Sequence, residues 1–354
     1  MSTYKIAVME GDGIGPEIVA ETVKVLQAAQ RKVDGLKLEL AELPVGLAAY
    51  ERYGSTLPSS TVEALKTCDG GILGPVTTHV YNVHDESMVN PSGKLRTELD
   101  LYANLRPARN FPGVNTRFEN VDMLIVRENT EGMYADRNLH EGNGEFMPDP
   151  DTVVSLRVVS RRKSERLARV GFELARARRK SVAVVHKKNV LRRGCGLFVD
   201  CCSMVAEEYP DVAVSDFHVD AFAMFMVQHP EKFDVIVTTN MFGDILSDLA
   251  AGLVGGLGLA PGLNLGDRFL LAQATHGSAP DIAGKNIANP IAEILSVQMM
   301  LEMLGIRNKD GRALEAAGRI KTAVEKTLEQ GVRTPDLGGT ATTSEFGDVV
   351  ASHV

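Results

Sequence analysis

Tryptophan is absent from the 354-residue chain, and aromatic residues make up only 5% of it. Proteins that bind single-stranded nucleic acid stack bases on such rings, so this class of protein is not expected. An excess of positive charge is also missing. The chain has 38 Lys and Arg but 46 Asp and Glu, which gives a net charge of −8. The basic surface of a nucleic-acid-binding domain is therefore missing, and we expect no nucleic-acid partner.

Long apolar runs are missing as well. No stretch approaches the roughly 20 apolar residues that a membrane helix needs. Met1 is followed by a polar run and a short strand at 5–9, and not by the apolar core of a signal peptide. We therefore expect a cytoplasmic protein that does not bind a membrane.

Cysteine is rare, and the four thiols do not form a recognisable motif. Cys68, Cys195, Cys201 and Cys202 lack the spacing of zinc ligands. Cys201 and Cys202 fall within a helical pattern at 194–208. We predict buried free thiols, which pack as small apolar groups.

The composition that remains is that of a globular protein, with 44% hydrophobic and 24% charged residues. The length fits two modest domains. Strand and helix patterns alternate, as in the helix 163–177, the strand 181–186 and the helix 194–208, which predicts an α/β fold. Residues 132–151 are rich in Gly, Asn, Asp and Pro, which predicts a projecting arm or hairpin over about 132–160, with 153–159 as a strand that pairs within it.

Two acids four residues apart, Asp244 and Asp248, begin the predicted helix 244–252. Residues at this spacing share one helix face, where two carboxylates repel each other unless a cation lies between them. Oxygen ligands suit Mg²⁺ or Mn²⁺. The alternative is a solvated acidic face at a helix N-terminus, which the helix dipole favours, and spacing alone favours that alternative.

Three arginines have a pattern that suits an anion. Arg96 lies on a predicted helix capped by Asn90, Arg106 on the extended stretch that stops at Pro107, and Arg127 at the end of an apolar strand. Guanidinium groups bind carboxylates through paired hydrogen bonds. Taken singly, each is better explained as an unrelated surface arginine.

A glycine-rich turn at Gly11–Gly15 follows the first strand, but it is a weak dinucleotide motif. The third glycine has the wrong spacing, and no acid closes a second strand at the expected distance. A loop at 276–289 has small residues that allow close approach of a ligand, and the alternative is an ordinary surface loop. There Asp281 can accept both hydroxyls of an adenine ribose, and it would repel a 2′-phosphate.

Together these segments resemble the β-decarboxylating dehydrogenase family, which acts on isocitrate, homoisocitrate, isopropylmalate, and tartrate or D-malate. The resemblance runs nearly end to end. It rests on GDGIGPE at 11–17, LRTELDLYANLRP at 95–107, VRENTEGMY at 126–134, HKKNV at 186–190, FDVIVTTNMFGDILSD at 233–248, GGLGLAP at 255–261 and HGSAPDIAGK at 276–285.

The resemblance implies a role for each candidate residue. It makes Arg96, Arg106 and Arg127 a substrate clamp, Lys187 the base for the C2 hydroxyl and Tyr134 the proton donor to the enol. It makes Asp220, Asp244 and Asp248 the ligands of Mg²⁺ or Mn²⁺. The implied NAD-binding residues are His276, Gly277, Ser278, Ala279, Asp281, Ile282 and Asn289.

The resemblance also implies the fold and the assembly. The expected fold has two discontinuous α/β domains with a cleft and is not a Rossmann fold. Residues 1–102 and 255–354 form the large domain, and 103–254 the small domain with the arm at 132–160. Lys187 and Asp220 are implied to reach the active site of a partner subunit, so we expect a homodimer or a higher oligomer.

The resemblance implies a small hydroxy acid as the substrate. It does not determine which chemical group the substrate carries at C3. Isopropylmalate enzymes have an apolar patch where this chain has Asn90, Pro91 and Ser92. A polar helix N-terminus favours an anionic substituent, so isocitrate or homoisocitrate leads. The loop 76–89, with His79, His84, Asp85 and Glu86, carries acids that disfavour a third carboxylate, which keeps D-malate and tartrate open. Isopropylmalate is the remaining alternative.

A different class of function is a non-catalytic regulatory subunit, as in hetero-oligomeric isocitrate dehydrogenases. Such chains lose active-site residues. Here the clamp arginines, the acids, Lys187 and Tyr134 are all present. We therefore expect an enzyme.

Overall fold

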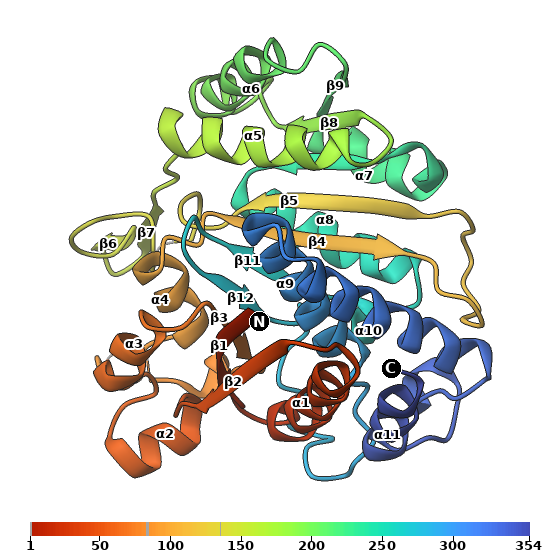
Figure 1. Cartoon of the computed structure of the whole chain (residues 1–354). Helices are drawn as coiled ribbons and strands as arrows, with labels where there is room; N and C mark the ends of the chain where they lie inside the picture. The colour runs from red at the N-terminus through yellow and green to blue at the C-terminus, as the bar shows by residue number, and fades with distance from the viewer. Residues whose placement is uncertain (1, 83–84, 135) are drawn as a thin grey trace. The chain divides into compact units, whose positions relative to one another are not determined.

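The computed structural model describes residues 2–82, 85–134 and 136–354, so His84 of the predicted loop lies outside the described residues. The chain forms two compact units (Figure 1). Unit 1 comprises Met1–Leu99, Phe111–Asn115 and Gly255–Val354, and unit 2 comprises Asp100–Asn110 and Thr116–Val254.

Unit 1 is built on five neighbouring strands in the order β2-β1-β3-β12-β11. Strands β1, β2, β3 and β12 pair in parallel, and β11 is antiparallel to β12. The bounds are β1 Ser2–Met9, β2 Leu36–Glu42, β3 Gly70–Leu73, β11 Leu263–Leu265 and β12 Leu270–Ala272. The alternation at Leu36–Glu42 thus forms the predicted strand, buried on one face at Leu36 and Leu38.

The long helices of unit 1 pack against one another: α1 contacts α9, α10 and α11. Their bounds are α1 Gly15–Lys32, α9 Ile291–Asn308, α10 Gly311–Glu329 and α11 Thr343–His353, and the shorter helices are α2 Gly46–Tyr53, α3 Ser59–Leu65 and α4 Pro91–Glu98. Pro16 lies in the first turn of α1, where its missing N–H has no helical acceptor to lose.

Unit 2 is built on strands in the order β4-β5-β10-β8-β9, with β4 antiparallel to β5 and the others parallel. The strand bounds are β4 Ala103–Arg109, β5 Asp122–Glu128, β8 Ser181–His186, β9 Ala213–His218 and β10 Val235–Thr238. The helix bounds are α5 Arg161–Arg176, α6 Arg192–Ala206, α7 Val219–Gln228 and α8 Asn240–Leu253.

Helices cover both faces of the unit 2 strands. Ile236 of β10 packs into a cluster with Phe222 of α7 and Leu246 of α8. The next residue, Val237, faces the opposite side, where a Cβ on Gly171 of α5 would lie 2.3 Å from its Cγ2. Because successive side chains of a strand point to opposite faces, α5 lies on the face away from α7 and α8.

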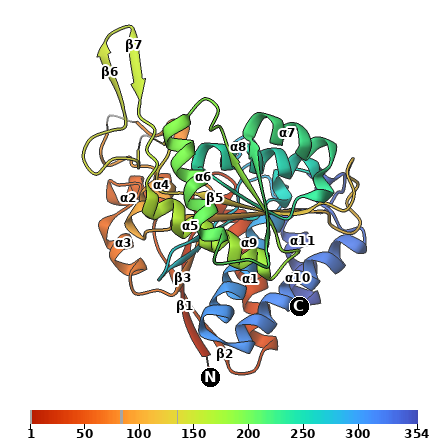
Figure 2. The ribbon, with the colours of Figure 1, turned by 90° about the horizontal axis from the view of Figure 1, so that it is seen from above.

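The predicted arm contains a hairpin. Strand β6 (Glu145–Asp149) pairs antiparallel with β7 (Thr152–Ser155), and Figure 2 shows the hairpin projecting beyond the helices of unit 2. Phe146, Met147 and Val153 are largely exposed along it. A two-stranded hairpin with exposed apolar side chains is marginal by itself.

The sequence misplaced several elements. Strand β4 does not stop at Pro107 but continues to Arg109, because the residues on both sides of Pro107 pair with β5 and one missing N–H does not break the ladder. The sequence predicts a helix over 91–101, but α4 ends at Glu98. Helices α2 and α7 were not predicted.

The four cysteines are buried and free, as predicted. Burial raises the pKa of the Cys202 thiol, which keeps it protonated. Among the described residues, no helix is both long and apolar enough to cross a membrane.

Candidate active site

Arg127 is the most deeply placed charge of unit 2, with a relative exposure of 1%. Its Nε donates to the backbone oxygen of Asn240 at 2.9 Å and to the Asn240 side chain at 3.0 Å, and Nη1 donates to Asp244. Burial and, after it, the charge of the neighbouring Arg106 lower the pKa of Arg127 to about 10. Gly243 makes room for it, because a Cβ there would lie 2.6 Å from Arg127 Cγ.

Arg106 reaches the same acid from β4. Its Nη1 donates to Asp244 Oδ1 at 2.9 Å and to Ser247 Oγ at 2.7 Å, and its Nε donates to Asn104 at 2.5 Å. Arg106 also lies 3.8 Å from Asp248. Arg106 and Arg127 thus meet at one acid of the same chain, Asp244.

Asp244 and Asp248 lie on one face of α8 and share Arg106 as a partner. Burial raises the pKa of Asp248, and the adjacent Asp244 raises it further. Their side chains remain 40% and 56% exposed, so a ligand can reach them. Two neighbouring carboxylates, one with a raised pKa, fit a divalent cation, which would remove the repulsion between them.

Tyr134 completes this cluster. Its hydroxyl donates to Asp244, and its ring contacts the guanidinium groups of Arg127, at 5.2 Å, and Arg137, at 4.8 Å. Burial raises the pKa of Tyr134, whereas the arginines oppose this shift. Arg137, which Asp136 holds through two hydrogen bonds of 2.9 and 3.0 Å, was missed by the sequence analysis.

Lys187 and Asp220 form a separate pair in unit 2. Lys187 follows β8, Asp220 lies in the first turn of α7, and Lys187 Nζ donates to Asp220 Oδ1 at 2.6 Å. Within residues 2–82, 85–134 and 136–354, no three His, Cys, Asp or Glu side chains gather in a way that could hold a metal ion. Asp220 therefore does not join Asp244 and Asp248 in a three-acid cluster within the described chain.

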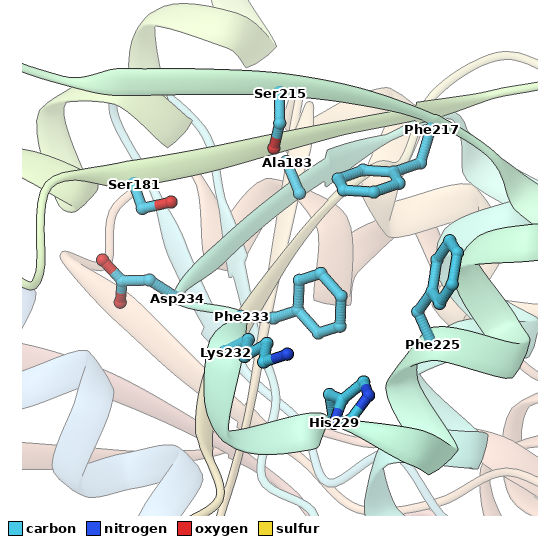
Figure 3. Close-up of a pocket in the computed structure, with 9 residues that line it drawn as sticks. All are labelled: Ser181, Ala183, Ser215, Phe217, Phe225, His229, Lys232, Phe233 and Asp234. Atoms are coloured by element: carbon cyan, nitrogen blue, oxygen red, sulfur yellow. The ribbon is translucent and has the colours of Figure 1, made fainter.

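A cavity of about 360 Å³ opens elsewhere in unit 2, where β8 and β9 begin (Figure 3). Phe217, Phe225 and Phe233 form its aromatic side, with Ser181 and Ser215 on the strands. The Asp234 carboxylate at its edge is already held by Arg178. None of the predicted site residues lines this cavity.

In unit 1, Arg96 and Ser92 of α4 share one acceptor. Ser92 Oγ donates to Gln273 Oε1 at 3.0 Å, and Arg96 Nη2 lies 3.4 Å from the same atom. Asn90 acts as the predicted N-cap, accepting from the Gly93 N–H at 3.2 Å. Gln273, which precedes the 276–289 loop, was not predicted and ties that loop to α4.

The loop 276–289 rests on the glycine-rich turn. Ile14 N donates to the Ser278 carbonyl at 2.9 Å, and Gly13 must be glycine because a Cβ would lie 2.0 Å from that oxygen. Glu17 accepts from the backbone N–H of Gly284 and from that of Asn286, the latter at 3.1 Å. The turn therefore supports the loop.

Asp12 organises the turn itself. Its carboxylate accepts from Leu47 N at 2.7 Å, from Thr77 N at 2.8 Å and from the hydroxyl of Tyr81 at 2.7 Å. Thr77 in turn donates through Oγ1 to Ser278 Oγ at 2.7 Å. This acid has a structural role that the motif alone did not reveal.

The predicted cofactor residues differ in their burial and in their hydrogen bonds. Ser278 is buried, Gly277 and Asp281 are exposed, and Ile282 is half-buried and donates its N–H to the carbonyl of Ala279 at 3.1 Å. Asn289 donates to Asp336 at 3.0 Å, a residue that the sequence analysis missed.

His276 is the one imidazole in this loop. Burial lowers its pKa, so it is neutral at pH 7, and its Nδ1 lies 3.0 Å from the carbonyl of Gly277. Its Nε2 is buried and has no hydrogen-bond partner among the described residues. An imidazole nitrogen in this state fits a ligand that supplies a polar group.

The loop 76–89 is held by its own acid. Asp85 accepts from Ser87 N at 2.9 Å and from the Tyr50 hydroxyl at 3.1 Å, and the hydrogen bonds from Ser87 lower the pKa of Asp85. Asp85 is therefore engaged within unit 1. His79 lies on the single turn Thr78–Val80 and is exposed.

Comparisons with known proteins point to one family. A sequence profile of the family "Isocitrate/isopropylmalate dehydrogenase" matches residues 5–350. The isocitrate/homoisocitrate dehydrogenase of Thermus thermophilus is 46% identical over 98% of this chain and 97% of its own. The 3-isopropylmalate dehydrogenase of Archaeoglobus fulgidus is 44% identical over 98% of each chain.

The crystal structure of isocitrate dehydrogenase from Methylococcus capsulatus superimposes with a TM-score of 0.89 at 43% identity, covering 99% of both chains. The chain belongs to the isocitrate/isopropylmalate dehydrogenase family. This dehydrogenase therefore has the α/β fold expected of the family. Because relatives named for isocitrate, homoisocitrate and isopropylmalate are almost equally similar, the comparisons leave the substrate open.

Proposed function

We propose that this dehydrogenase catalyses the NAD- and divalent-metal-dependent oxidative decarboxylation of a (2R)-hydroxy acid, with isocitrate or homoisocitrate as the leading substrates. The observation that carries the proposal is the convergence of Arg106, Arg127 and Tyr134 on Asp244. Two guanidinium groups, a phenol and two exposed acids at one place suit a polycarboxylate and the cation that it chelates.

The arginines bind and orient the substrate. Arg127 is fixed by Asn240 and Arg106 by Asn104 and Ser247, so both present their remaining N–H groups with little loss of side-chain entropy. The resemblance adds Arg96 to the clamp and assigns Asn90 and Ser92 to the C3 substituent. The guanidinium groups hold the substrate carboxylates in place while bonds at C2 and C3 break and form.

Lys187 and Tyr134 move the protons. Lys187 takes the proton of the C2 hydroxyl as hydride leaves C2, and Tyr134 returns a proton to C3 after CO₂ departs. Asp220, Asp244 and Asp248 are the residues that would hold Mg²⁺ or Mn²⁺, and the cation would supply Lewis-acid chemistry to the substrate. Their all-oxygen donor set and the raised pKa of Asp248 support this assignment.

The cofactor is proposed to bind along the loop 276–289. The unpartnered Nε2 of His276 and the exposed carboxylate of Asp281 support this. Asp281 accepts the ribose hydroxyls of NAD and repels the 2′-phosphate of NADP. One relative, a catalytic subunit from Arabidopsis thaliana that is 41% identical, is named as an NAD isocitrate dehydrogenase.

A homodimer with shared active sites is part of the proposal. Apolar side chains are exposed on α7 at Met224 and Val227, on α8 at Met241 and Ile245, and along the hairpin of the arm. Large exposed apolar groups that cluster on neighbouring elements mark protein–protein interfaces. A partner subunit would cover them and would bring Lys187 and Asp220 to the other chain's acids.

The second candidate substrate is 3-isopropylmalate, because an isopropylmalate dehydrogenase is almost as similar as the isocitrate/homoisocitrate enzyme. A turnover panel separates the candidates. Isocitrate, homoisocitrate, isopropylmalate, D-malate and tartrate are each given to the enzyme with NAD⁺ and Mn²⁺, and NADH is followed by absorbance. We expect the highest kcat/KM with isocitrate or homoisocitrate. If the enzyme turns over none of these acids, the proposal is overturned.

A further inference from the structure

The turn that carries Lys187 is held by a buried histidine. His186, the last residue of β8, is 1% exposed. Its Nε2 lies 3.0 Å from the Asp216 carboxylate on the neighbouring strand β9. Its Nδ1 lies 3.1 Å from the backbone nitrogen of Lys188. One imidazole thus links an acid on β9 to the backbone directly after Lys187.

These two partners fix the tautomer of the ring. A backbone N–H can only donate, so Nδ1 of His186 must be the unprotonated acceptor. The proton is then on Nε2, where it donates to Asp216 Oδ2. A carboxylate that accepts from one ring nitrogen selects the tautomer and orients the other nitrogen, as in acid–histidine pairs behind metal sites.

The backbone of Lys187 is held from the other side. Its N–H donates to the thiol sulfur of buried Cys195 at 3.3 Å, and its carbonyl accepts from Val190 N at 3.1 Å and Leu191 N at 2.8 Å. The Lys187 N–H, the Lys187 carbonyl and the Lys188 N–H are thus all hydrogen-bonded. The direction in which the side chain leaves the turn is therefore set.

We propose that Asp216 and His186 are positioning residues, which fix the Nε2–H tautomer and thereby aim Lys187 at its substrate proton. This inference rests on the proposed role of Lys187 as the base. Neither residue touches the reacting atoms. A displacement of a reacting group by about 1 Å costs on the order of 100-fold in rate, so a loosened turn lowers kcat while substrate binding by the arginines persists.

The first test observes the ring directly. Long-range ¹H–¹⁵N correlation spectra of the intact enzyme distinguish the tautomers of its eight histidines, and loss of one signal in His186→Asn assigns the ring. We expect His186 to be neutral at pH 7.5 with Nδ1 unprotonated. A proton on Nδ1 would overturn the inference, whatever the activity of the enzyme.

The second test separates the two ring nitrogens by substitution. His186→Asn keeps an oxygen acceptor near the position of Nδ1, whereas His186→Gln keeps a polar group near Nε2 and loses the acceptor for Lys188 N–H. We expect kcat to fall no more than about 3-fold for Asn and at least about 30-fold for Gln, with KM for the hydroxy acid within about 3-fold of the native value in both.

Controls make the outcome decisive. Asp216→Asn retains an acceptor for Nε2–H and should keep most of kcat, whereas Asp216→Leu should lose it. His229→Asn, at an exposed histidine, should change nothing. Equal losses for His186→Asn and His186→Gln at native thermal stability would contradict the inference. Full activity of Lys187→Met would instead refute the proposed base, and the spectra would still report the tautomer.

Discussion

The side-chain nitrogen of Lys187 lies 2.6 Å from the Asp220 carboxylate, so two residues with different predicted roles are paired with each other. The Asp220 side chain is 65% exposed, and its hydrogen bond from Lys187 lowers the pKa of the acid. Because both belong to unit 2 and are bound to each other, a partner subunit that receives one of them should receive both.

Complementation tests this sharing. Lys187→Met and Tyr134→Phe should each be nearly inactive alone. In a mixed dimer, one of the two sites combines the intact Tyr134 of one chain with the intact Lys187 of the other. After denaturation and refolding of an equal mixture, half the dimers are mixed, so we expect about a quarter of native activity.

The control for complementation mixes two variants that damage the same side of the site, Tyr134→Phe and Asp248→Asn. In their mixed dimer each site retains one damaged residue, so activity should stay low. If the first mixture also shows no recovery while sizing columns show dimers, Lys187 acts within its own chain.

Asp248→Asn should abolish metal-dependent turnover without unfolding the protein. Asp248 lies 3.8 Å from Arg106 and is half exposed. The substitution removes one negative charge that a bound cation needs. We expect kcat to fall at least about 100-fold and the Tm to change by less than a few degrees, since exposed substitutions have small effects on stability. Asp211→Asn, which removes an exposed acid paired with Arg176, serves as the matched control. Undiminished activity of the native enzyme in excess chelator would argue against a metal.

Asp281 should decide between the two nicotinamide cofactors. The native enzyme should prefer NAD over NADP by at least about 100-fold in kcat/KM, because the carboxylate accepts ribose hydroxyls and repels a phosphate. Asp281→Asn should lower that preference about 10-fold, since it removes the repulsion. Steady-state kinetics with both cofactors measures this, and a native preference for NADP would refute the assignment.

Glu293 should make stability depend on pH. It lies in the first turn of α9, its Oε2 accepts from Ala274 N at 2.8 Å, and burial raises its pKa to about 8. Its unfolded pKa is near 4.5. The folded state thus holds a proton that the unfolded state has released, so stability falls as pH rises from about 4.5 to 8, by up to about 1.4 kcal/mol per pH unit.

The variant Glu293→Gln isolates this effect, because it cannot titrate. The Tm of the native enzyme should fall relative to that of Glu293→Gln between pH 5 and pH 8, with no further divergence above pH 8.5. Scanning calorimetry at matched ionic strength measures the difference. Parallel Tm curves across this range would show that the Glu293 carboxyl is not held protonated.

Local pattern in the sequence was enough for those features that depend on a few neighbouring residues. The i, i+4 spacing of Asp244 and Asp248 does place them on one face of α8, next to Arg106. The Asn90 cap, the four buried thiols and the hairpin of the arm were also predicted correctly. Weak local signals failed at the short helices α2 and α7.

What only the tertiary structure decided are the contacts between residues far apart in the chain. No sequence motif indicated three of these contacts: that of Arg137 with Tyr134, that of Gln273 with Ser92, and that of Asp336 with Asn289. The glycine turn was a weak nucleotide motif by sequence, and folding made Glu17 a support of the 276–289 loop. Sequence determined which chemical groups the chain carries and which lie on one helix face or strand end, because those follow from backbone periodicity. Which of these groups meet depends on strand order and packing, and these arise from the whole chain.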